Sequence, residues 1–594
     1  MDKLIDLSET IEKPFNKILF SFLQQPVERF LGIDSLNGCY ARFREKAEFG
    51  IPFRSTFETI LDTLNVHYSC NEALLQQVPV SGPLVVVSNH PFGGLDGIIL
   101  GSMMSKIRSD VRILGNYLLK QIDGLEERII AVNPFENRNI HENYAGLKQA
   151  LQWLGQGGAL IVFPSGEVAS WNRKRQAVTD PEWSSHIAAL IRKTRATTLP
   201  VYFPGRNSAL FSLAGLLSPR LRTLMLPREL INKGNQSVTV HIGRPIAWSF
   251  LKRRDCDKEL IDYLRTTTEI LQYQANDKPR GVDERKIQFI SNRKTVEPLI
   301  AQTAADTIRR EIDTLPDDQI LVSSGEHVVY IATSTQIPNV LREIGRLREQ
   351  AFRAVGEGTG RSIDVDRFDV HYRHLFLYNR KTNEVIGGYR LGLVKEILDS
   401  IGRKGLYTNT LFRFHPSFFD PADRMIEFGR SFVRVEYQRK NNCLITIWKG
   451  IGEFIRRNPQ YRMLYGPVSI RNDYHDFSKK LMIDFLSRYH GDPGWSSRVK
   501  PRHPYLEKAR MDFRNHATLS YDETIEDVAH WISQIEPDGK GIPTMLKHYL
   551  KLNGKVLCFN IDQDFSNVID GLILVDLDNI HAHICRRFIG ASDV

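Results

Sequence analysis

Cysteine is scarce in this chain, and the six residues that occur lie far apart. They are Cys39, Cys70, Cys256, Cys443, Cys558 and Cys585. No two of them form a CxxC pair, so the sequence predicts neither a disulfide framework nor a zinc site. This use of cysteine is typical of a protein from a reducing cytoplasm.

Long hydrophobic runs are also missing. No uncharged apolar stretch of the sequence approaches the roughly 18 residues that a membrane-spanning helix needs. The chain opens with Met-Asp-Lys and carries Asp6, Glu9 and Glu12 soon afterwards, which is unlike a secretory signal. We therefore expect any contact with a membrane to be peripheral.

The balance of charge is positive. Lysine and arginine outnumber aspartate and glutamate by 79 to 69, a formal net charge of +10 over 594 residues. This excess suggests an acidic partner, such as an anionic lipid, a nucleic acid or an acidic carrier protein. Nucleic acid is the least favoured, because neither paired zinc ligands nor an aromatic RNP strand accompanies the charge. The length predicts two or more domains.

The first half is organised around a short apolar strand, 84–87, that runs into a turn rich in glycine and proline. The turn carries His90 and Asp96. A nearby carboxylate fixes the tautomer of a histidine and stabilises the imidazolium that forms when it takes a proton, which favours a general base. The alternative is a plain turn with one satisfied histidine.

Strands alternate with helical segments around this turn. Residues 1–80 have the spacing of helices, and so do residues 144–154. Apolar runs predict further strands at 111–114, 129–132, 159–163, 198–203 and 238–242. The alternation predicts an α/β layer structure.

Four blocks within residues 80–250 resemble the glycerolipid-type acyltransferase family in order and spacing. They are Asn89-His90 with Asp96, Val132–Arg138, Phe163–Glu167 and Leu199–Tyr202. The resemblance implies a glycerolipid-acyltransferase α/β domain whose histidine–aspartate turn acylates a lipid hydroxyl, with His90 and Asp96 as catalytic residues. It also implies a set of substrate-binding residues, namely Asn89, Gly93, Gly94, Asn137, Arg138, Pro164, Ser165, Gly166 and Glu167.

The chain departs from the family pattern in two places. Five residues separate His90 from Asp96, one more than the family usually has. The extra residue falls in the Gly93-Gly94 segment, where we expect backbone freedom to absorb it. In the third block Ser165 takes the place of the usual glutamate and Glu167 follows the glycine, which leaves the role of Glu167 open.

Two further features bear on the acceptor. Arg138 is a candidate for gripping an anionic head group, because a guanidinium binds carboxylate or phosphate in bidentate fashion; the alternative is a solvated surface arginine. Residues 206–230 mix large apolar residues with arginines, which fits an interfacial segment that dips into lipid head groups. The alternative there is an ordinary pair of amphipathic core helices.

The second half restarts after a polar joint, about 274–319. Strands are predicted at 330–333, 374–378, 385–391 and 425–433, and helices over 341–352 and 444–455. Mixed strands with a helix after the central one suit a GNAT-like α/β sheet.

An ordered set of motifs in residues 325–580 resembles the N-acyltransferases that make lyso-ornithine lipid, a family similar to the acyl-homoserine-lactone synthases. The motifs include Leu347-Arg348, Asp366–Asp369, Gly388–Leu391 and Glu427–Arg430. The resemblance implies a network around the amine and the thioester formed by Arg348, Phe352, Asp366, Asp369, Arg390, Glu427 and Arg430.

Within that set, Glu427 is the candidate catalytic base. An amine must lose a proton before it attacks a thioester, and a carboxylate can take that proton directly or through water. The alternative is a structural pair between Glu427 and Arg430 or Arg390. Residues 434–442 contain no glycine, which disfavours tight coenzyme A binding by a glycine-rich loop without excluding it.

Together these features predict a bifunctional acyltransferase of amino-acid lipid synthesis. Its parts are a helical extension at 1–80, an O-acyltransferase domain at 81–273, a linker with a helix at 274–325 and a GNAT-like N-acyltransferase domain at 326–585. The second domain is expected to N-acylate ornithine with a 3-hydroxyacyl chain, and the first to O-acylate the resulting lyso-lipid.

The prediction of a bifunctional acyltransferase also implies which partners to expect. Acyl carrier protein is the expected donor, with acyl-coenzyme A as a possible one, and thioester transfer needs no metal or redox cofactor. The expected location is the cytoplasmic face of the bacterial inner membrane, bound peripherally.

Three other functions stay open. One is a synthase of glycine lipid or of another amino-acid lipid. Another is a lysophosphatidate acyltransferase fused to an unrelated GNAT domain. The third is a peripheral membrane-binding protein without catalysis, which has no need of the His90–Asp96 pair or of Glu427 with Arg430.

Overall fold

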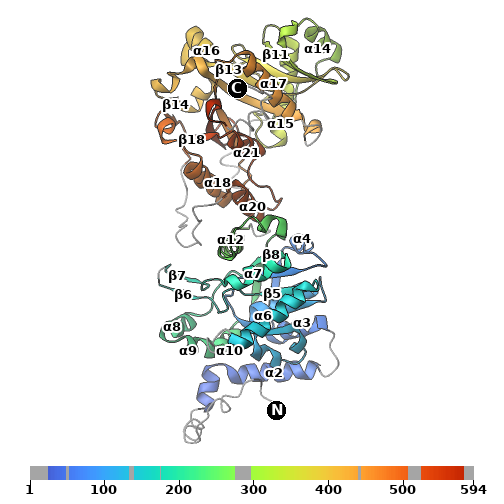
Figure 1. The fold of residues 1–594 in the computed structure, drawn as a ribbon, viewed down its shortest axis with the longest axis vertical. Coiled ribbons are helices and arrows are strands. Elements are labelled where there is room, and N and C mark those ends of the chain that lie inside the picture. The colour runs from blue at the N-terminus through green and yellow to red at the C-terminus, as the bar shows by residue number, and fades with distance from the viewer. Residues whose placement is uncertain are drawn as a thin grey trace. The chain divides into compact units, whose positions relative to one another are not determined.

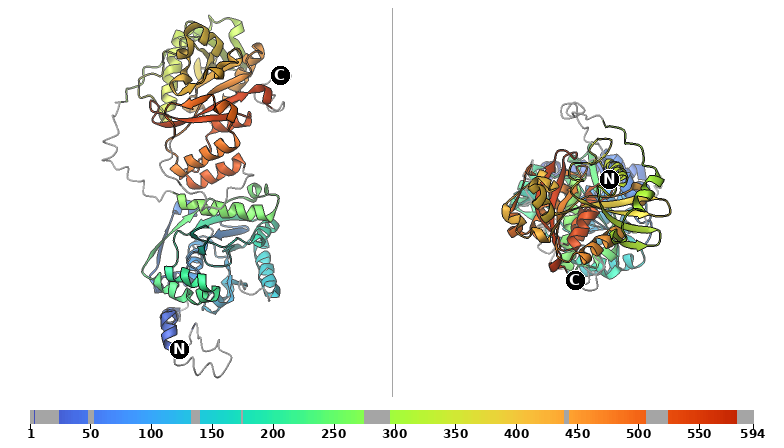
Figure 2. Two further views of the ribbon diagram at one scale, coloured as in Figure 1. Left: turned by 90° about the vertical axis from the view of Figure 1, so that its left-hand side faces the viewer. Right: turned by 90° about the horizontal axis from the view of Figure 1, so that it is seen from above.

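The structure is a computed structural model of the chain. It describes residue 4 and residues 24–47, 53–132, 140–173, 175–274, 296–438, 443–505 and 524–580. The chain divides into two compact units (Figures 1 and 2). The first is formed chiefly by residues 1–277, and the second by most of the remainder. Each unit is described by itself.

The first unit contains a seven-stranded sheet in the order β1-β9-β8-β2-β5-β3-β4. The strands are β1 His67–Cys70, β2 Leu84–Ser88, β3 Val111–Asn116, β4 Ile129–Val132, β5 Ala159–Val162, β8 Thr197–Tyr202 and β9 Ser237–Ile242. All neighbours pair in parallel except β8 with β9. Every residue of β2 and β5 is buried, which explains why these strands are uniformly apolar rather than alternating.

Helices cover this sheet. They include α2 Ile33–Ala47, α3 Phe53–Leu64, α5 Gly94–Ser105, α6 Ile140–Gly155, α7 Ser185–Thr194 and α12 Asp257–Ile270. The predicted α/β layer structure is therefore confirmed. The helical reading of residues 1–80 was incomplete, because His67–Cys70 forms strand β1 beside β9. A four-residue edge strand of mixed polarity is too short to give a two-residue period.

Helices α3 and α5 meet very closely. Gly101 of α5 lies against the ring of Phe57, and a Cβ added at Gly101 would lie 2.5 Å from that ring. Phe57 is 1% exposed and belongs to the main core of the unit together with Leu61, Leu95 and Ile99. Glycine is therefore required by the close approach of the two helices.

The second unit contains an eight-stranded mixed sheet in the order β10-β11-β12-β13-β15-β16-β19-β18. The strands are β10 Ile320–Ser324, β11 His327–Thr333, β12 Arg373–Asn379, β13 Glu384–Leu393, β15 Met425–Val433, β16 Met463–Ile470, β18 Lys555–Asp562 and β19 Val568–Asp576. Neighbours are antiparallel except β15 with β16. Helices α15 Pro338–Ala354, α17 Cys443–Arg457 and α18 Asp476–Tyr489 belong to this unit.

The parallel strands β15 and β16 pair over only three residues. The pairing ends at Glu427 with Tyr465, although β15 continues to Val433 and β16 to Ile470. Just beyond this point Arg430 has a φ of 51°, and the register of β15 against β13 shifts between Gly388 and Arg390. A positive φ at a residue with a long side chain is unfavourable, so the surrounding contacts must hold this bulge in place.

We expect Gly101→Val to destabilise the first unit by about 1–3 kcal/mol, because the new side chain overlaps the Phe57 ring in a packed core. Calorimetry of thermal unfolding measures the effect. The matched control is Gly155→Ala at the end of α6, where an added Cβ meets nothing within 4 Å. Equal transition temperatures for the Gly101→Val variant and the control variant would contradict this packing.

Candidate active sites

The first site lies where β2 ends and α5 begins. Gly93 has a φ of 84° and precedes the helix, and Asp96 lies in the first helical turn. The Asp96 Oδ2 atom accepts the backbone N–H groups of Phe92 at 2.9 Å and Gly93 at 3.1 Å. The segment with the extra residue thus curls around the Asp96 carboxylate, and the positive φ of Gly93 makes the turn possible.

His90 and Asp96 are in direct contact. The Nδ1 atom of His90 lies 3.0 Å from Oδ2 of Asp96, which is fully buried, while the His90 side chain is 16% exposed. Burial raises the pKa of Asp96, and the bonds from His90 and from the two backbone groups lower it. A carboxylate on Nδ1 directs the other ring nitrogen, Nε2, to act as the base. The plain-turn alternative does not describe this geometry.

Two neighbours fix the position of His90. Its ring stacks on Phe163 with centroids 4.1 Å apart, and its backbone N–H donates to Asp180 Oδ1 at 3.2 Å. Trp183 Nε1 donates to the other oxygen of Asp180 at 3.1 Å. Burial raises the pKa of Asp180 to about 6. Sequence reasoning missed Asp180, since it lies 90 positions from His90 with no local motif.

The side chain of Asn89 is hydrogen-bonded to the backbone of Phe203, and its predicted role in substrate binding stays a prediction. Its side-chain amide donates to the carbonyl of Phe203 at 2.9 Å, and its side-chain oxygen accepts the Phe203 N–H at 2.8 Å. Both hydrogen-bonding functions of the amide are thus used to join the end of β2 to the end of β8. Asn89 therefore shapes the site through the backbone.

The third block lies beside the histidine. Ala169 N–H donates to the His90 carbonyl at 2.9 Å. Glu167 forms an ion pair with Arg222 of helix α9, Pro219–Leu224, and the Ser165 hydroxyl donates to the Glu167 carbonyl at 2.8 Å. Gly166 has a φ of 66° and makes this turn possible. The open question about Glu167 thus has a structural answer, and Arg222 is a partner that the sequence did not indicate.

The remaining residues predicted for this site divide into two groups. Pro164 lies in the turn after β5, whereas Gly94 is the first residue of α5, and a Cβ added at Gly94 would meet nothing within 4 Å. Asn137 and Arg138 lie outside the described residues. The predicted roles of these four residues in substrate binding stay predictions.

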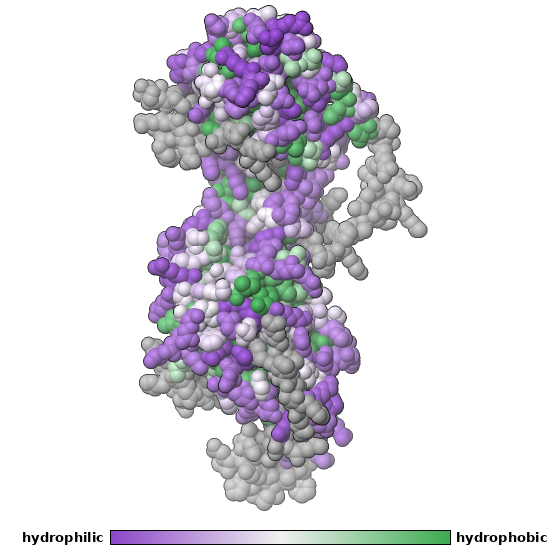
Figure 3. Space-filling view, turned by 90° about the vertical axis from the view of Figure 1, so that its right-hand side faces the viewer, coloured by the Kyte–Doolittle hydropathy of each residue, from purple (hydrophilic) through white to green (hydrophobic). Residues whose placement is uncertain are grey.

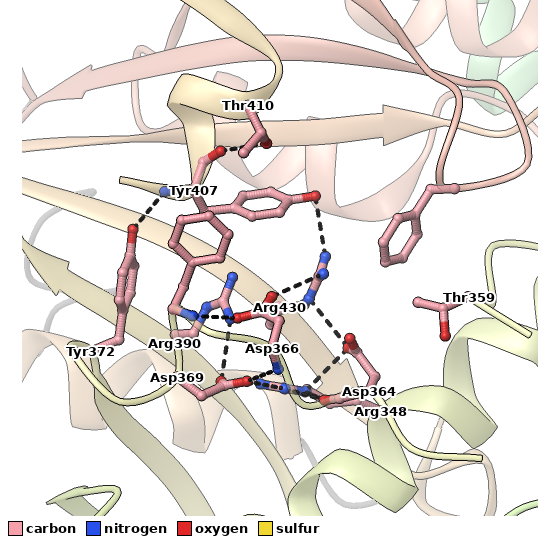
Figure 4. Close-up of polar contacts among 12 residues, drawn as sticks. Arg348, Thr359, Asp364, Asp366, Asp369, Tyr372, Arg390, Tyr407, Thr410 and Arg430 are labelled. Carbon is pink, nitrogen blue, oxygen red and sulfur yellow. Dashed lines mark hydrogen bonds and ion pairs between the residues drawn. The ribbon is translucent and has the colours of Figure 1, made fainter. Parts of the chain in front are cut away.

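The second site is a buried network of arginines and aspartates (Figure 4). Arg348 of α15 forms a bidentate salt bridge with Asp369, with one guanidinium nitrogen 3.0 Å from each carboxylate oxygen. Arg390 of β13 reaches Asp369 at 3.2 Å and Asp366 at 2.7 Å. Although burial opposes ionisation, the two arginines hold the pKa of Asp369 well below its usual range.

Arg430 completes this network from the bulge of β15. It lies 3.2 Å from Asp364 and 3.4 Å from Asp366, and it donates to the Tyr407 hydroxyl at 3.3 Å. Figure 4 shows Arg430 between Asp364 on one side and Tyr407 on the other. The structure therefore brings together the charged residues predicted from sequence and adds two that were missed, Asp364 and Tyr407.

Phe352 stands apart from the charges. It packs at the edge of the core around α15 and meets the ring of Phe565 edge to face, with centroids 6.0 Å apart. The Arg430 guanidinium lies 4.5 Å from the centre of the Phe565 ring. The two phenylalanines thus form an apolar border to the network.

Glu427 is separate from the arginines. Its Oε1 atom accepts the backbone N–H of Thr408 at 2.8 Å, and the Tyr465 hydroxyl donates to Oε2 at 3.3 Å. Among the described residues, the carboxylate partners of Arg390 and Arg430 are aspartates. The hydrogen bonds of Glu427 thus go to Thr408 and Tyr465, and the charge of Arg390 acts on it without a direct ion pair. Burial raises the pKa of Glu427 to about 7, which suits a base at neutral pH.

The described residues contain no group of three or more histidine, cysteine, aspartate or glutamate side chains that could hold a metal ion. Each site instead offers a carboxyl group that can support proton transfer from a nucleophile. A base of this kind in each unit is what acyl transfer to a hydroxyl or an amine requires, so the geometry is compatible with an acyltransferase.

The comparisons with known proteins agree with this class. Residues 35–277 match the family described as acyltransferase, and residues 347–448 match the family described as acetyltransferase (GNAT) domain. A glycine N(alpha)-acyltransferase from Bacteroides thetaiotaomicron is 32% identical over 302 residues, which cover 48% of this chain and 87% of the relative. The chain belongs to the acyltransferase family that includes this relative, and it joins an acyltransferase domain to a GNAT domain in one polypeptide.

An O-acyltransferase and a solved structure are also similar to parts of the chain. A lyso-glycine lipid O-acyltransferase from Phocaeicola vulgatus is 29% identical over 181 residues, which cover 29% of this chain and 63% of the relative. Among solved structures, the 1-acyl-sn-glycerophosphate acyltransferase PlsC from Thermotoga maritima is 14% identical, with a TM-score of 0.24, covering 45% of this chain and 97% of the PlsC chain.

The burial of Glu427 predicts a pH dependence. A base acts only when ionised, so N-acylation should rise with pH and level off above about 7. Tyr465→Phe removes a donor to the ionised carboxylate, raises its pKa further and should move the rise to higher pH. The measurement is kcat/KM for amide formation against pH.

The control is Glu427→Gln, which should lower the rate by roughly 10²–10⁴-fold and lose the break near neutral pH. A wild-type profile without that break, or a Tyr465→Phe profile moved to lower pH, contradicts the role of Glu427.

Proposed function

We propose that the chain makes a doubly acylated amino-acid lipid in two steps, one in each unit. The observation that carries this proposal is the presence of two separate proton acceptors, Glu427 in the GNAT unit and the His90–Asp96 pair in the other unit. The functions for which the relatives are named, glycine N-acylation and O-acylation of lyso-glycine lipid, support it.

The first step forms an amide. The amine of the amino acid attacks the carbonyl carbon of a 3-hydroxyacyl thioester, and Glu427 takes the proton that the nitrogen loses. The C–N bond forms, the C–S bond breaks, and the thiolate leaves and takes up a proton. The guanidinium groups of Arg390 and Arg430 supply positive charge for the amino-acid carboxylate, and Asp364, Asp366 and Asp369 fix their orientation.

The second step forms an ester on the 3-hydroxyl group that the first acyl chain brings. Nε2 of His90 takes the hydroxyl proton while the oxygen attacks a second acyl thioester. The C–O bond forms and the C–S bond breaks. Asp96 stabilises the imidazolium, which then returns the proton to the leaving thiolate.

Glycine is the acceptor that the relatives support best. Ornithine is the second candidate, and one feature favours it. Asp562 and Asp570, which are 5% and 3% exposed, lie close enough to Arg430 to interact electrostatically, and burial raises the pKa of Asp570 to about 8. The second ammonium group of ornithine would compensate these carboxyl groups. Competition between labelled glycine and ornithine for the purified protein decides between them.

The donor is proposed to be an acyl carrier protein thioester. The net charge of +10 suits this acidic partner, and the segment 434–442 has no glycine for a pyrophosphate loop. Coenzyme A thioesters are the second donor. Thioester transfer to an amine or a hydroxyl requires no metal or redox cofactor, and the proposed place of action is the cytoplasmic face of the inner membrane.

The two sites should fail in different ways. With His90→Ala the hydroxyl loses its base, so the N-acylated lyso-lipid should accumulate and the diacyl lipid should disappear. With Glu427→Gln the amide step fails first, and neither lipid should form. Mass spectrometry of lipids from an expression host without amino-acid lipids measures both outcomes.

Synthetic lyso-lipid is the control for the second variant. Because its His90 site is intact, Glu427→Gln should convert the added lyso-lipid to the diacyl product. A folded His90→Ala protein that still makes the diacyl lipid overturns the assignment of O-acylation. If lysophosphatidate is the only acceptor, the alternative of a lysophosphatidate acyltransferase fused to an unrelated GNAT domain is favoured. If no acceptor is acylated, the alternative of a membrane-binding protein without catalysis is favoured.

A further inference from the structure

Helices α8, Ala209–Leu217, and α9, Pro219–Leu224, carry an unusual group of exposed leucines. These are Leu210, Leu213, Leu216, Leu217, Leu221 and Leu224, of which Leu217 is 81% and Leu213 57% exposed. We refer to them as the leucine face. Figure 3 shows another face of the molecule, on which hydrophilic residues predominate around smaller apolar areas.

The leucine face is the outward side of helices whose inward side is already packed. Phe211 and Ala214 of α8 are buried together with Met225 and Val168 in a small core. Helix α8 contains no charged residue. The exposed leucines are thus surplus to the packing of the unit, and a contiguous apolar surface of this kind is typical of an interaction site.

The charges around the leucine face are positive. Residues 206–233 contain five basic residues and one acidic residue. The acidic residue, Glu229, is 1% exposed and accepts hydrogen bonds from the backbone and hydroxyl of Ser208, so its charge is turned inward. Arg228 lies over the ring of Phe30, itself 54% exposed, and Arg206 is exposed. Leucines bordered by arginines match an anionic lipid surface, which offers acyl chains below and negative head groups above.

Direct contacts join the leucine face to the His90 site. Arg222, between Leu221 and Leu224 on α9, is paired with Glu167. Val168 packs on Phe211, and the next residue, Ala169, donates its N–H to the His90 carbonyl. A Cβ added at Gly93 would lie 3.2 Å from Leu226. The segment that bears the leucines therefore lies beside the His90 turn, although Leu213 and Leu217 themselves point to the surface.

We propose that the leucine face docks on an anionic bilayer and that this docking delivers the lyso-lipid hydroxyl from the bilayer to His90. The inference rests on the proposed O-acylation. Among the described residues, no helix is both long enough and apolar enough to cross a membrane, so attachment here is through a surface. A substrate with a long acyl chain stays in the bilayer, and an enzyme that acts on its hydroxyl must lie at that surface.

The test uses the full chain with the double substitution Leu213→Ser/Leu217→Ser. Binding is measured by flotation with vesicles of mixed phosphatidylglycerol and phosphatidylcholine. We expect the variant to bind these vesicles more weakly by roughly an order of magnitude or more, because two inserted side chains lose most of their apolar surface. Wild-type protein should bind vesicles of phosphatidylcholine alone more weakly than the mixed vesicles.

The matched control is Val80→Ser/Tyr117→Ser, which changes two exposed apolar residues of the same unit outside the leucine face, 73% and 53% exposed. It should bind as the wild type does. O-acylation of a lyso-lipid held in vesicles should fall with binding in the leucine variant. O-acylation of a short-chain, water-soluble lyso-lipid should stay at the wild-type level, which also shows that the variant is folded.

Three outcomes overturn the proposal. One is equal vesicle binding by the leucine variant and the control. Another is an equal loss of activity on soluble and vesicle-held substrates. The third is a wild-type dimer in sedimentation velocity that the leucine substitutions dissociate, since the face would then be covered by a second copy. Failure of the wild type to acylate either lyso-lipid, with vesicle binding intact, tells against the proposed function and not against docking.

Discussion

A carboxyl group that is removed from water must be compensated, and the way this is done sets the chemistry of each unit. In the first unit Asp96 is fully buried, and its Oδ2 is compensated by two backbone N–H groups and by the ring of His90. The N–H groups of Phe92 and Gly93 fix the position of the Asp96 carboxylate, and the carboxylate in turn fixes the orientation of the His90 ring. The apolar strand β2, the positive φ of Gly93 and the start of α5 all serve this contact.

In the second unit two buried carboxyl groups, those of Asp369 and Glu427, are compensated in different ways. Asp369 is compensated by two arginines and stays ionised, so it acts as a rigid support for Arg348 and Arg390. Glu427 accepts a backbone N–H and a tyrosine hydroxyl, and burial outweighs these contacts and the charge of Arg390, so its pKa rises to about 7. This separation of charge into a fixed network and a protonatable carboxyl group is the basis of the proposal that one site both orients a substrate and takes a proton.

Much of this could be predicted from the sequence, because the relevant signals are local. The apolar run before His90 predicts its own strand, and the glycines after it predict the turn. The order of the arginine and aspartate motifs predicts the second network. Each of these features can be predicted either from residues that are adjacent in the sequence or from a motif pattern shared with a family.

What the sequence did not reveal depends on contacts between distant segments. Asp180 reaches the His90 backbone across 90 positions, and Arg222 reaches Glu167 across 55. Nothing near either residue indicates its partner. The alternative of a Glu427–arginine pair rested on charge alone, and the structure pairs both arginines with aspartates from a loop that is distant in the sequence. Strand β1 was missed because four residues are too few for a period.

The central claim is that two independent sites act in sequence on one product. The most direct measurement is complementation between two variants that each lack one of the two activities. His90→Ala and Glu427→Gln are purified and mixed with the amino acid, acyl carrier protein thioesters and anionic vesicles, and the lipids are followed by mass spectrometry. The account predicts that the mixture makes the diacyl lipid through released lyso-lipid, whereas neither protein does so alone. A mixture of folded variants that makes lyso-lipid but never the diacyl lipid, while the wild type makes both, would contradict it.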